Sequence, residues 1–135
     1  MSSTEPSDDQ SISDTELLWR RVLPGQEHYD EQLERFRPQS GAVFDADSEL
    51  SVDIASLTTK ENCLANAPSK MYLAEFSVET VGRAGCRVIR DPSESNPAHA
   101  LVCGDHRNGG PTQGQARAIA KDAKFVVFEI PKEYS

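Results

Sequence analysis

The stretch GCRVIRDPSESNPAHALVCGDHRNGGPTQGQARAIAKDAKFVVF, residues 85–128, contains most of the signals that decide the fold. Two short apolar runs in it, Cys86–Arg90 and Ala98–Cys103, are bounded by Pro and Gly residues, which is typical of β-strands. The loop Gly104–Pro111 that follows has three glycines and no large apolar side chain. We expect it to lie at the surface, where loops often carry function.

The clearest helix signal comes directly after this loop. Thr112 and Gln115 have the spacing of a capping box, in which each side chain bonds the backbone of the other residue. Small and apolar residues then recur at the i, i+3, i+4 and i+7 positions of one helix face, namely Ala116, Ile119, Ala120 and Ala123. Phe125–Ile130 is expected to be the last strand, ended by Pro131.

The first third of the chain predicts a less regular arrangement. Glu16–Leu23 is expected to be a strand, because the Pro24-Gly25 turn ends it after eight residues. Residues 28–37 place Tyr29, Leu33 and Phe36 at helical spacing and predict a short amphipathic helix. Gly41–Phe44 is expected to be a further short strand.

The middle of the chain alternates strands with short helices. Leu50–Ser56 has the apolar–polar alternation of a half-buried strand. A capping box formed by Thr58 and Glu61 predicts a helix of about two turns, ended by Pro68. Met71–Phe76 reads as a strand, after which Ser77 caps a short helix that Gly85 ends in the left-handed region.

These elements predict an α+β fold in one small domain, residues 15–135, with a mixed or antiparallel sheet and three to four short helices. Residues 1–14 are rich in Ser, Asp and Glu, and we expect a disordered acidic tail there. Residues 1–50 contain 12 acidic and 4 basic residues, whereas residues 51–135 contain 10 of each. The net charge of −8 therefore arises in the first third of the chain, and it argues against non-specific binding to nucleic acid.

Three cysteines, Cys63, Cys86 and Cys103, occur without CxxC spacing. This pattern predicts buried reduced thiols rather than a disulfide framework or a zinc site. Neither a secretory signal nor a membrane-spanning run is evident, so the sequence predicts a cytosolic protein. We expect no metal and no cofactor.

One candidate site lies where the glycine-rich loop meets the predicted helix. Helix N-termini present free N–H groups to anions, and a basic stripe at i, i+4 and i+7 would flank them. The site would bind a phosphate or a carboxylate of a partner protein, while the alternative is an ordinary capped surface helix. Its residues are Gly109, Gly110, Thr112, Arg117, Lys121 and Lys124.

A second, enzymatic interpretation combines residues from separate strands. Arg20 or Arg21, Ser51 and Glu129 occur in the order used by a class of ADP-ribosyl transferases, and they would supply a cation, a hydroxyl and a carboxylate. His99 is a further candidate, although it lies about 13 Å from Cys103 along a strand. The sequence favours a half-buried structural residue there, hydrogen-bonded through a neighbouring turn.

Three blocks, SVDIASLTT (51–59), NPAHALV (96–102) and QARAIAK (115–121), resemble segments of a group of short bacterial proteins in the same order. The resemblance covers residues 15–128. It implies a bacterial cytosolic protein with one stable domain, and it implies no activity.

The sequence thus predicts a small acidic module that binds another protein without catalytic activity. The alternative is a nucleotide- or NAD-dependent transferase or hydrolase that uses Arg21, Ser51, His99 and Glu129. An enzyme would require a concave pocket in which polar groups converge. An interaction module would instead present an exposed apolar patch.

Overall fold

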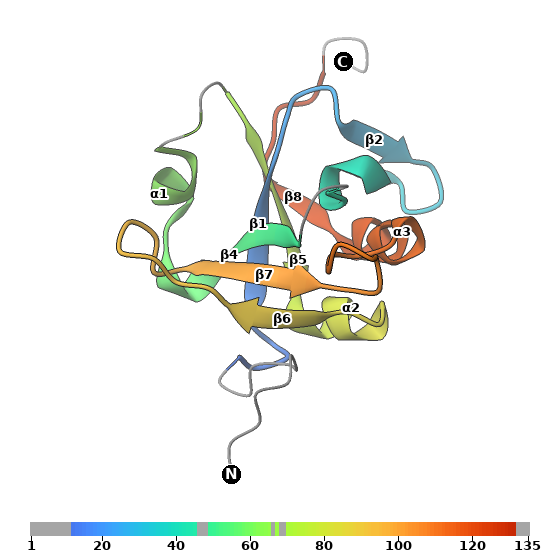
Figure 1. Cartoon of the computed structure of the whole chain (residues 1–135). Helices are drawn as coiled ribbons and strands as arrows, with labels where there is room; N and C mark the ends of the chain where they lie inside the picture. The colour runs from blue at the N-terminus through green and yellow to red at the C-terminus, as the bar shows by residue number, and fades with distance from the viewer. Residues whose placement is uncertain (1–11, 46–48, 66, 68–69, 132–135) are drawn as a thin grey trace.

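The fold is a six-stranded antiparallel sheet with short helices, together with a separate two-stranded hairpin (Figure 1). A computed structural model describes residues 12–45, 49–65, 67 and 70–131. The α+β class predicted from the sequence is confirmed, and the sheet is antiparallel throughout.

The strands of the sheet stand in the order β6-β7-β4-β1-β5-β8. Their bounds are β1 Leu17–Val22, β4 Leu50–Ile54, β5 Tyr72–Ser77, β6 Arg87–Arg90, β7 His99–Cys103 and β8 Lys124–Val127. The ladder between β1 and β5 has six residue pairs, whereas that between β1 and β4 pairs only Leu18 with Ile54 and Trp19 with Asp53. Beyond these pairs the two strands separate, and Figure 1 shows β4, β7 and β6 running across the direction of β1.

Short helices connect the strands, and their ends follow the capping signals in the sequence. The α-helices are α1 Lys60–Ala65, α2 Val78–Arg83 and α3 Gln113–Asp122, and the 3-10 helices are η1 Ser40–Val43 and η2 Ala55–Leu57. The Thr112–Gln115 capping box is formed in both directions, and Ser77 caps α2. Before α1, however, the backbone N–H of Asn62 donates to the hydroxyl of Thr59, so the cap lies one residue later than predicted.

The main core lies between one face of the sheet and the helices α2 and α3. Apolar side chains of β1, β4, β5, β6 and β7 meet Val81 of α2 and Ile119 of α3 there, both fully buried. Ile12 also packs into this core, with 7% of its surface exposed. Ile12 falls in the segment 1–14 that the sequence assigns to a disordered tail, and the structure differs there. Residues 1–11 of that predicted tail lie outside the described residues.

The opposite face of the sheet is covered only in part. Cys63 and Leu64 of α1 pack on Trp19 and Leu73 in a small cluster. Toward β7 the face carries polar side chains instead. This difference between the two faces positions the candidate site.

Residues 28–37 form a β-hairpin, so the helix predicted there is wrong. The strands are β2 Glu27–Asp30 and β3 Arg35–Pro38, and Tyr29 faces Phe36 across them with ring centroids 5.2 Å apart. Asp30 fixes the turn, because its Oδ1 accepts from the N–H groups of Gln32 and Leu33. Its Oδ2 accepts from Nε of Arg37 at 2.8 Å.

Asp30 makes the stability of the hairpin depend on pH. The hydrogen bond from Arg37 holds the pKa of Asp30 below its ordinary value, which is about 4. A carboxyl with a depressed pKa stabilises the fold above that ordinary value, and the contribution is lost as the pH falls through the folded-state pKa. We expect Asp30→Asn, which keeps an acceptor for the turn, to melt a few degrees below the wild type at pH 7. In thermal melts from pH 7 to below the folded-state pKa of Asp30, the melting temperatures of the variant and the wild type should converge. A gap that stays constant over this range would show that the ion pair does not stabilise the hairpin.

Gly41–Phe44 is also not a strand. Residues 40–43 form the 3-10 helix η1, in which Ala42 and Val43 are buried. Arg20 Nε donates to the Ala42 carbonyl at 3.1 Å, so η1 is held against β1 by a side chain rather than by a strand ladder.

Candidate functional site

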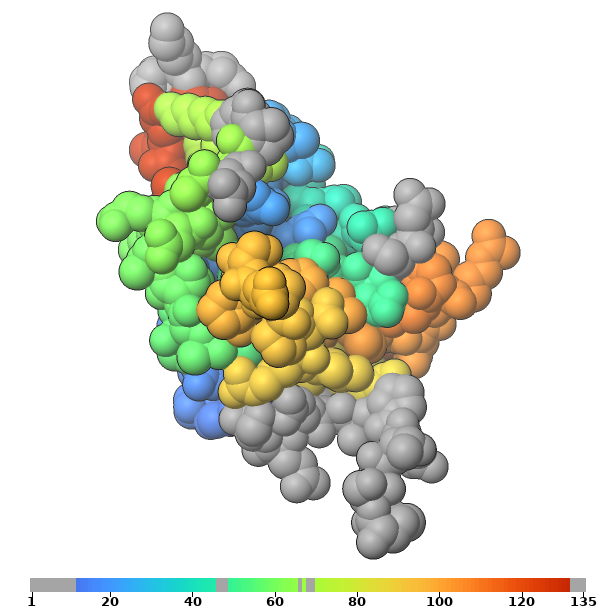
Figure 2. Space-filling view, turned by 60° about the vertical axis from the view of Figure 1, so that its left-hand side comes forward, coloured from blue at the N-terminus to red at the C-terminus, as the bar shows by residue number. Residues whose placement is uncertain are grey.

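A polar cleft of about 450 Å³ lies on the partly covered face of the sheet. Its floor comes from β1, β4 and β7, one wall comes from η2 and α1, and the opposite wall comes from the loop before β7. Figure 2 shows this face, with the loop projecting beside the green segment that contains α1 and the blue of β1 lying deeper. Such a volume is in the range of small-ligand sites.

The sheet register brings three side chains of the floor into one row. Trp19 pairs with Asp53, and Asp53 pairs with His99. Residues directly opposite in an antiparallel ladder point to the same face, with Cα atoms about 5 Å apart. Asp53 therefore lies between an aromatic and an imidazole side chain.

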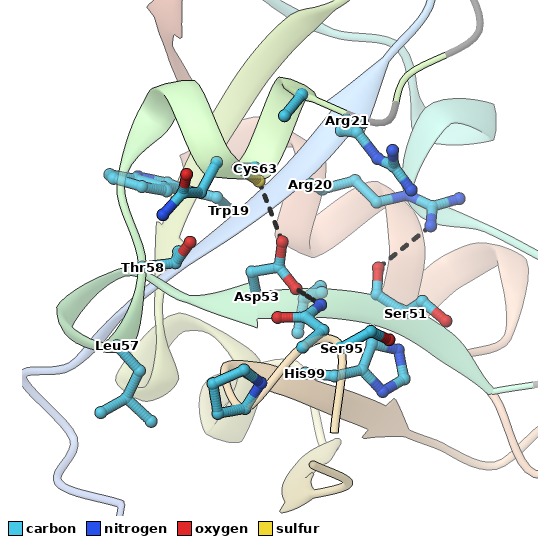
Figure 3. A pocket seen from close by; sticks show the side chains of 15 residues that line it. Trp19, Arg20, Arg21, Ser51, Asp53, Leu57, Thr58, Cys63, Ser95 and His99 are labelled. Carbon is cyan, nitrogen blue, oxygen red and sulfur yellow. Dashed lines mark hydrogen bonds between the residues drawn. The ribbon is translucent and has the colours of Figure 1, made fainter. Parts of the chain in front are cut away.

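Two neighbouring arginines of β1 form the basic end of the cleft (Figure 3). Arg20 is held in place, because it donates to the Ala42 carbonyl and, at 3.0 Å, to the Ser51 carbonyl. These bonds replace the strand ladder where β1 and β4 separate. Burial lowers the pKa of Arg20, the carboxylate of Asp45 opposes this shift, and the charge of Arg21 adds to it. Guanidinium groups nevertheless stay charged in proteins.

Arg21 differs from Arg20 in having no fixed partner. Arg21 is exposed at the cleft, and its guanidinium donates no hydrogen bond to any residue in the described part of the chain. Figure 3 shows its side chain beside that of Arg20. A free guanidinium next to a fixed one provides donors for an incoming anion.

Asp53 is bonded to both walls of the cleft. Its Oδ2 accepts from the thiol of Cys63 at 2.9 Å, and its Oδ1 accepts from the side-chain amide of Asn96 at 2.8 Å. Burial and the hydrogen bond to Asp53 raise the pKa of the Cys63 thiol to about 12. Cys63 is therefore protonated near pH 7, and a thiol in that state is a poor nucleophile.

His99 is oriented from outside the cleft. Its Nδ1 lies 3.0 Å from the Asp91 carbonyl and 3.1 Å from Asp91 Oδ2. A carboxylate at one ring nitrogen fixes the imidazole plane and leaves the other nitrogen for a ligand. Asn96 steadies the same loop, since its side-chain oxygen accepts from the N–H of Ala98.

Trp19 anchors the inner side of the cleft. It is 9% exposed, and its indole N–H donates to Glu75 Oε2 at 3.0 Å. A buried indole generally needs such a partner. Because Glu75 lies on β5, this bond ties the cleft floor to the neighbouring strand.

The structure gathers most of the residues of the enzymatic interpretation but separates one. Arg20, Arg21, Ser51 and His99 all line the cleft. Glu129 does not line it; it follows β8, its carboxylate bonds Lys70, and its carbonyl accepts from the hydroxyl of Tyr72. The order Arg–Ser–Glu in the sequence therefore does not correspond to one assembled set.

The residues predicted to bind an anion before α3 are arranged differently from the prediction. The N–H groups of Gly109, Gly110 and Thr112 donate to His106, Asn108 and Gln115, in that order. Arg117 and Lys121 are exposed on α3, but Lys124 lies on β8, with its Nζ 3.7 Å from Glu75 Oε1. The three cations therefore do not form one helical stripe. We place the candidate site in the cleft instead.

All three cysteines are free and buried, as predicted. Burial raises the pKa of each thiol, to about 11 in Cys86 and to about 12 in Cys63. Among the described residues, no three His, Cys, Asp or Glu side chains are grouped so as to hold a metal ion.

Sequence reasoning missed several residues of the cleft, among them Asp53, Leu57, Asn62 and Asn96. The only signal for Asp53 was its polar position in an alternating strand. Asn96 lies before a proline, just ahead of the predicted strand, and no local pattern indicates a role for its side chain.

The chain matches no family model, no curated protein and no solved structure at a significant level. In the part of the chain that the structure describes, no helix has the length and apolarity needed to cross a bilayer.

Proposed function

We propose that this protein is a small binding module, without catalytic activity of its own, whose cleft receives the anionic part of a ligand. The observation that carries the proposal is the pair formed by Arg20, which is fixed by two carbonyls, and Arg21, which is free at the mouth of the cleft. His99 and the hydroxyl of Ser51 line the same cleft. A partner protein, the class of ligand that the sequence favours, would meet the same groups with a single carboxylate.

The test uses pyrophosphate as a probe anion, followed by backbone amide NMR shifts. We expect the perturbed amides to be those of the cleft. We expect Arg21→Gln to weaken binding at least about tenfold, since a charge-assisted hydrogen bond contributes about 1.5–3 kcal/mol. Arg117→Gln, an exposed arginine outside the cleft, is the matched control and should bind like the wild type. Perturbations confined to the loop before α3, lost in Arg117→Gln, would overturn the proposal.

One observation favours the enzymatic alternative, a nucleotide-dependent transferase or hydrolase. The contact of His99 with Asp91 is the arrangement that orients a general base. In that case His99→Gln would abolish turnover of a nucleotide substrate and leave its binding nearly unchanged. The binding module predicts that the wild-type protein turns over none of the nucleotides it binds.

A further inference from the structure

We infer that the ligand of the cleft is a nucleoside monophosphate, with its phosphate at the arginine end and its base at the end formed by η2 and α1. This inference rests on the proposed function, because it assigns a ligand class to the same anion-binding cleft. It follows from four features of the cleft: its two unlike ends, an amide on α1, the carboxylate between the ends, and its size.

The two ends of the cleft differ in chemistry. Figure 3 shows Arg20, Arg21, Ser51 and His99 toward one end, and Leu57 and Thr58 toward the other. Leu57 is 44% exposed and lines the cleft at this end. The exposed Pro97 lines the same cleft. A planar base would cover these apolar surfaces, while a phosphate would meet the guanidinium groups.

An amide is available to bond the edge of a base. Asn62, on α1, lines the cleft and is exposed, and its side chain has no hydrogen-bond partner among the residues that the structure describes. An amide offers a donor and an acceptor, as the edges of nucleobases do. Asn96, in contrast, is already held by Asp53 and Ala98.

Asp53 lies between the two ends (Figure 3). Each of its oxygens accepts one hydrogen bond from a wall of the cleft, and an ionised carboxylate has about four acceptor positions in total. It therefore retains capacity for the hydroxyl groups of a ribose. A carboxylate near the middle of the cleft would repel a ligand with several negative charges along its length, such as an acidic peptide.

The size of the cleft also favours a small molecule over a protein segment. About 450 Å³ suits a ligand of mononucleotide size. A stable protein partner generally buries about 800 Å² on each side, and the cleft is bounded by a wall on either side of its floor.

The experiment is a calorimetric titration of the full chain with the four common nucleoside monophosphates, the corresponding nucleosides, ribose 5-phosphate and inorganic phosphate. We expect at least one nucleoside monophosphate to bind about tenfold more tightly than both its nucleoside and ribose 5-phosphate, because both ends of the cleft then contribute. Arg21→Gln should weaken binding of the monophosphate and leave that of the nucleoside unchanged. Leu57→Ser should weaken both and leave that of phosphate unchanged. Leu23→Ser, an exposed leucine outside the cleft, is the apolar control.

The outcomes separate the two proposals. If inorganic phosphate or pyrophosphate binds at Arg21 but no nucleoside monophosphate binds more tightly than ribose 5-phosphate, the nucleotide inference is overturned and the anion-binding function stands. If an acidic peptide displaces pyrophosphate where nucleotides do not, the inference is overturned in favour of a protein partner. If no anion binds in the cleft, both proposals fall.

Discussion

Leu18→Ala should lower the free energy of unfolding by about 3–5 kcal/mol, whereas Leu17→Ala should change it by less than about 0.5 kcal/mol. The two leucines are neighbours on β1, but Leu18 is fully buried and Leu17 is 39% exposed. Leu18 points into the main core between the sheet and its helices. A loss of this size is a large part of the total stability of a small domain, which is about 5–15 kcal/mol.

Urea unfolding monitored by far-ultraviolet circular dichroism measures both variants on the same scale. Leu17→Ala is the control for Leu18→Ala, since the substitution is identical and the two side chains differ only in the face of the strand from which they project. Similar losses in the two variants would mean that β1 does not have the alternation described here. A fall in the m-value of the Leu18 variant alone would instead indicate that its native state has loosened.

The elements that the sequence predicts correctly are those with local signals. Thr112 and Gln115 define the start of α3, and Gly85, with φ of +86°, follows α2 as expected. Leu50–Ile54 forms a strand because its alternation matches a sheet with one buried face. Each of these signals acts within a few residues.

The hairpin at residues 27–38 shows where local spacing fails. Tyr29, Leu33 and Phe36 have helical spacing, yet Leu33 is 43% exposed at the turn and Tyr29 packs across the strands on Phe36. The side chain of Asp30 caps the turn and binds Arg37, and these bonds compete with a helix. The spacing of apolar residues carries no information on such a bond between residues seven apart.

The cleft was only partly predictable for a different reason. Arg21 and Ser51 could be named from their order along the chain, and His99 could be named as an imidazole on a predicted strand. Their convergence depends on β4 lying between β1 and β7, an order that the sequence does not reveal. Glu129 was grouped with them by sequence order alone, and strand order places it elsewhere.

Gly104→Ala should destabilise the protein by about 2–3 kcal/mol, although glycine to alanine is a small change. Gly104 follows β7 and lies under the start of α3. A Cβ there would lie 2.6 Å from Cα of Pro111, 2.6 Å from Oε1 of Gln115 and 2.9 Å from the Gly110 carbonyl oxygen. Two of these three atoms are backbone, and the N–H of Gly104 is bonded to the Gly109 carbonyl, so the loop cannot move aside without losing that bond.

Gly114→Ala is the matched control, and its effect should have the opposite sign. Gly114 lies in the first turn of α3, where the nearest atom to an added Cβ is Oγ1 of Thr112 at 3.9 Å. Alanine there should raise the free energy of unfolding by about 0.5–1 kcal/mol, because glycine loses more backbone entropy in a helix. Both variants are measured by the same urea titration. Each replaces one glycine by alanine near the start of α3, one before the helix and one in its first turn. If Gly104→Ala proved as stable as Gly114→Ala, the backbone at Gly104 would not pack closely against the Gly110–Pro111 segment as described here. A loss in both variants would indicate that the first turn of α3 is not helical.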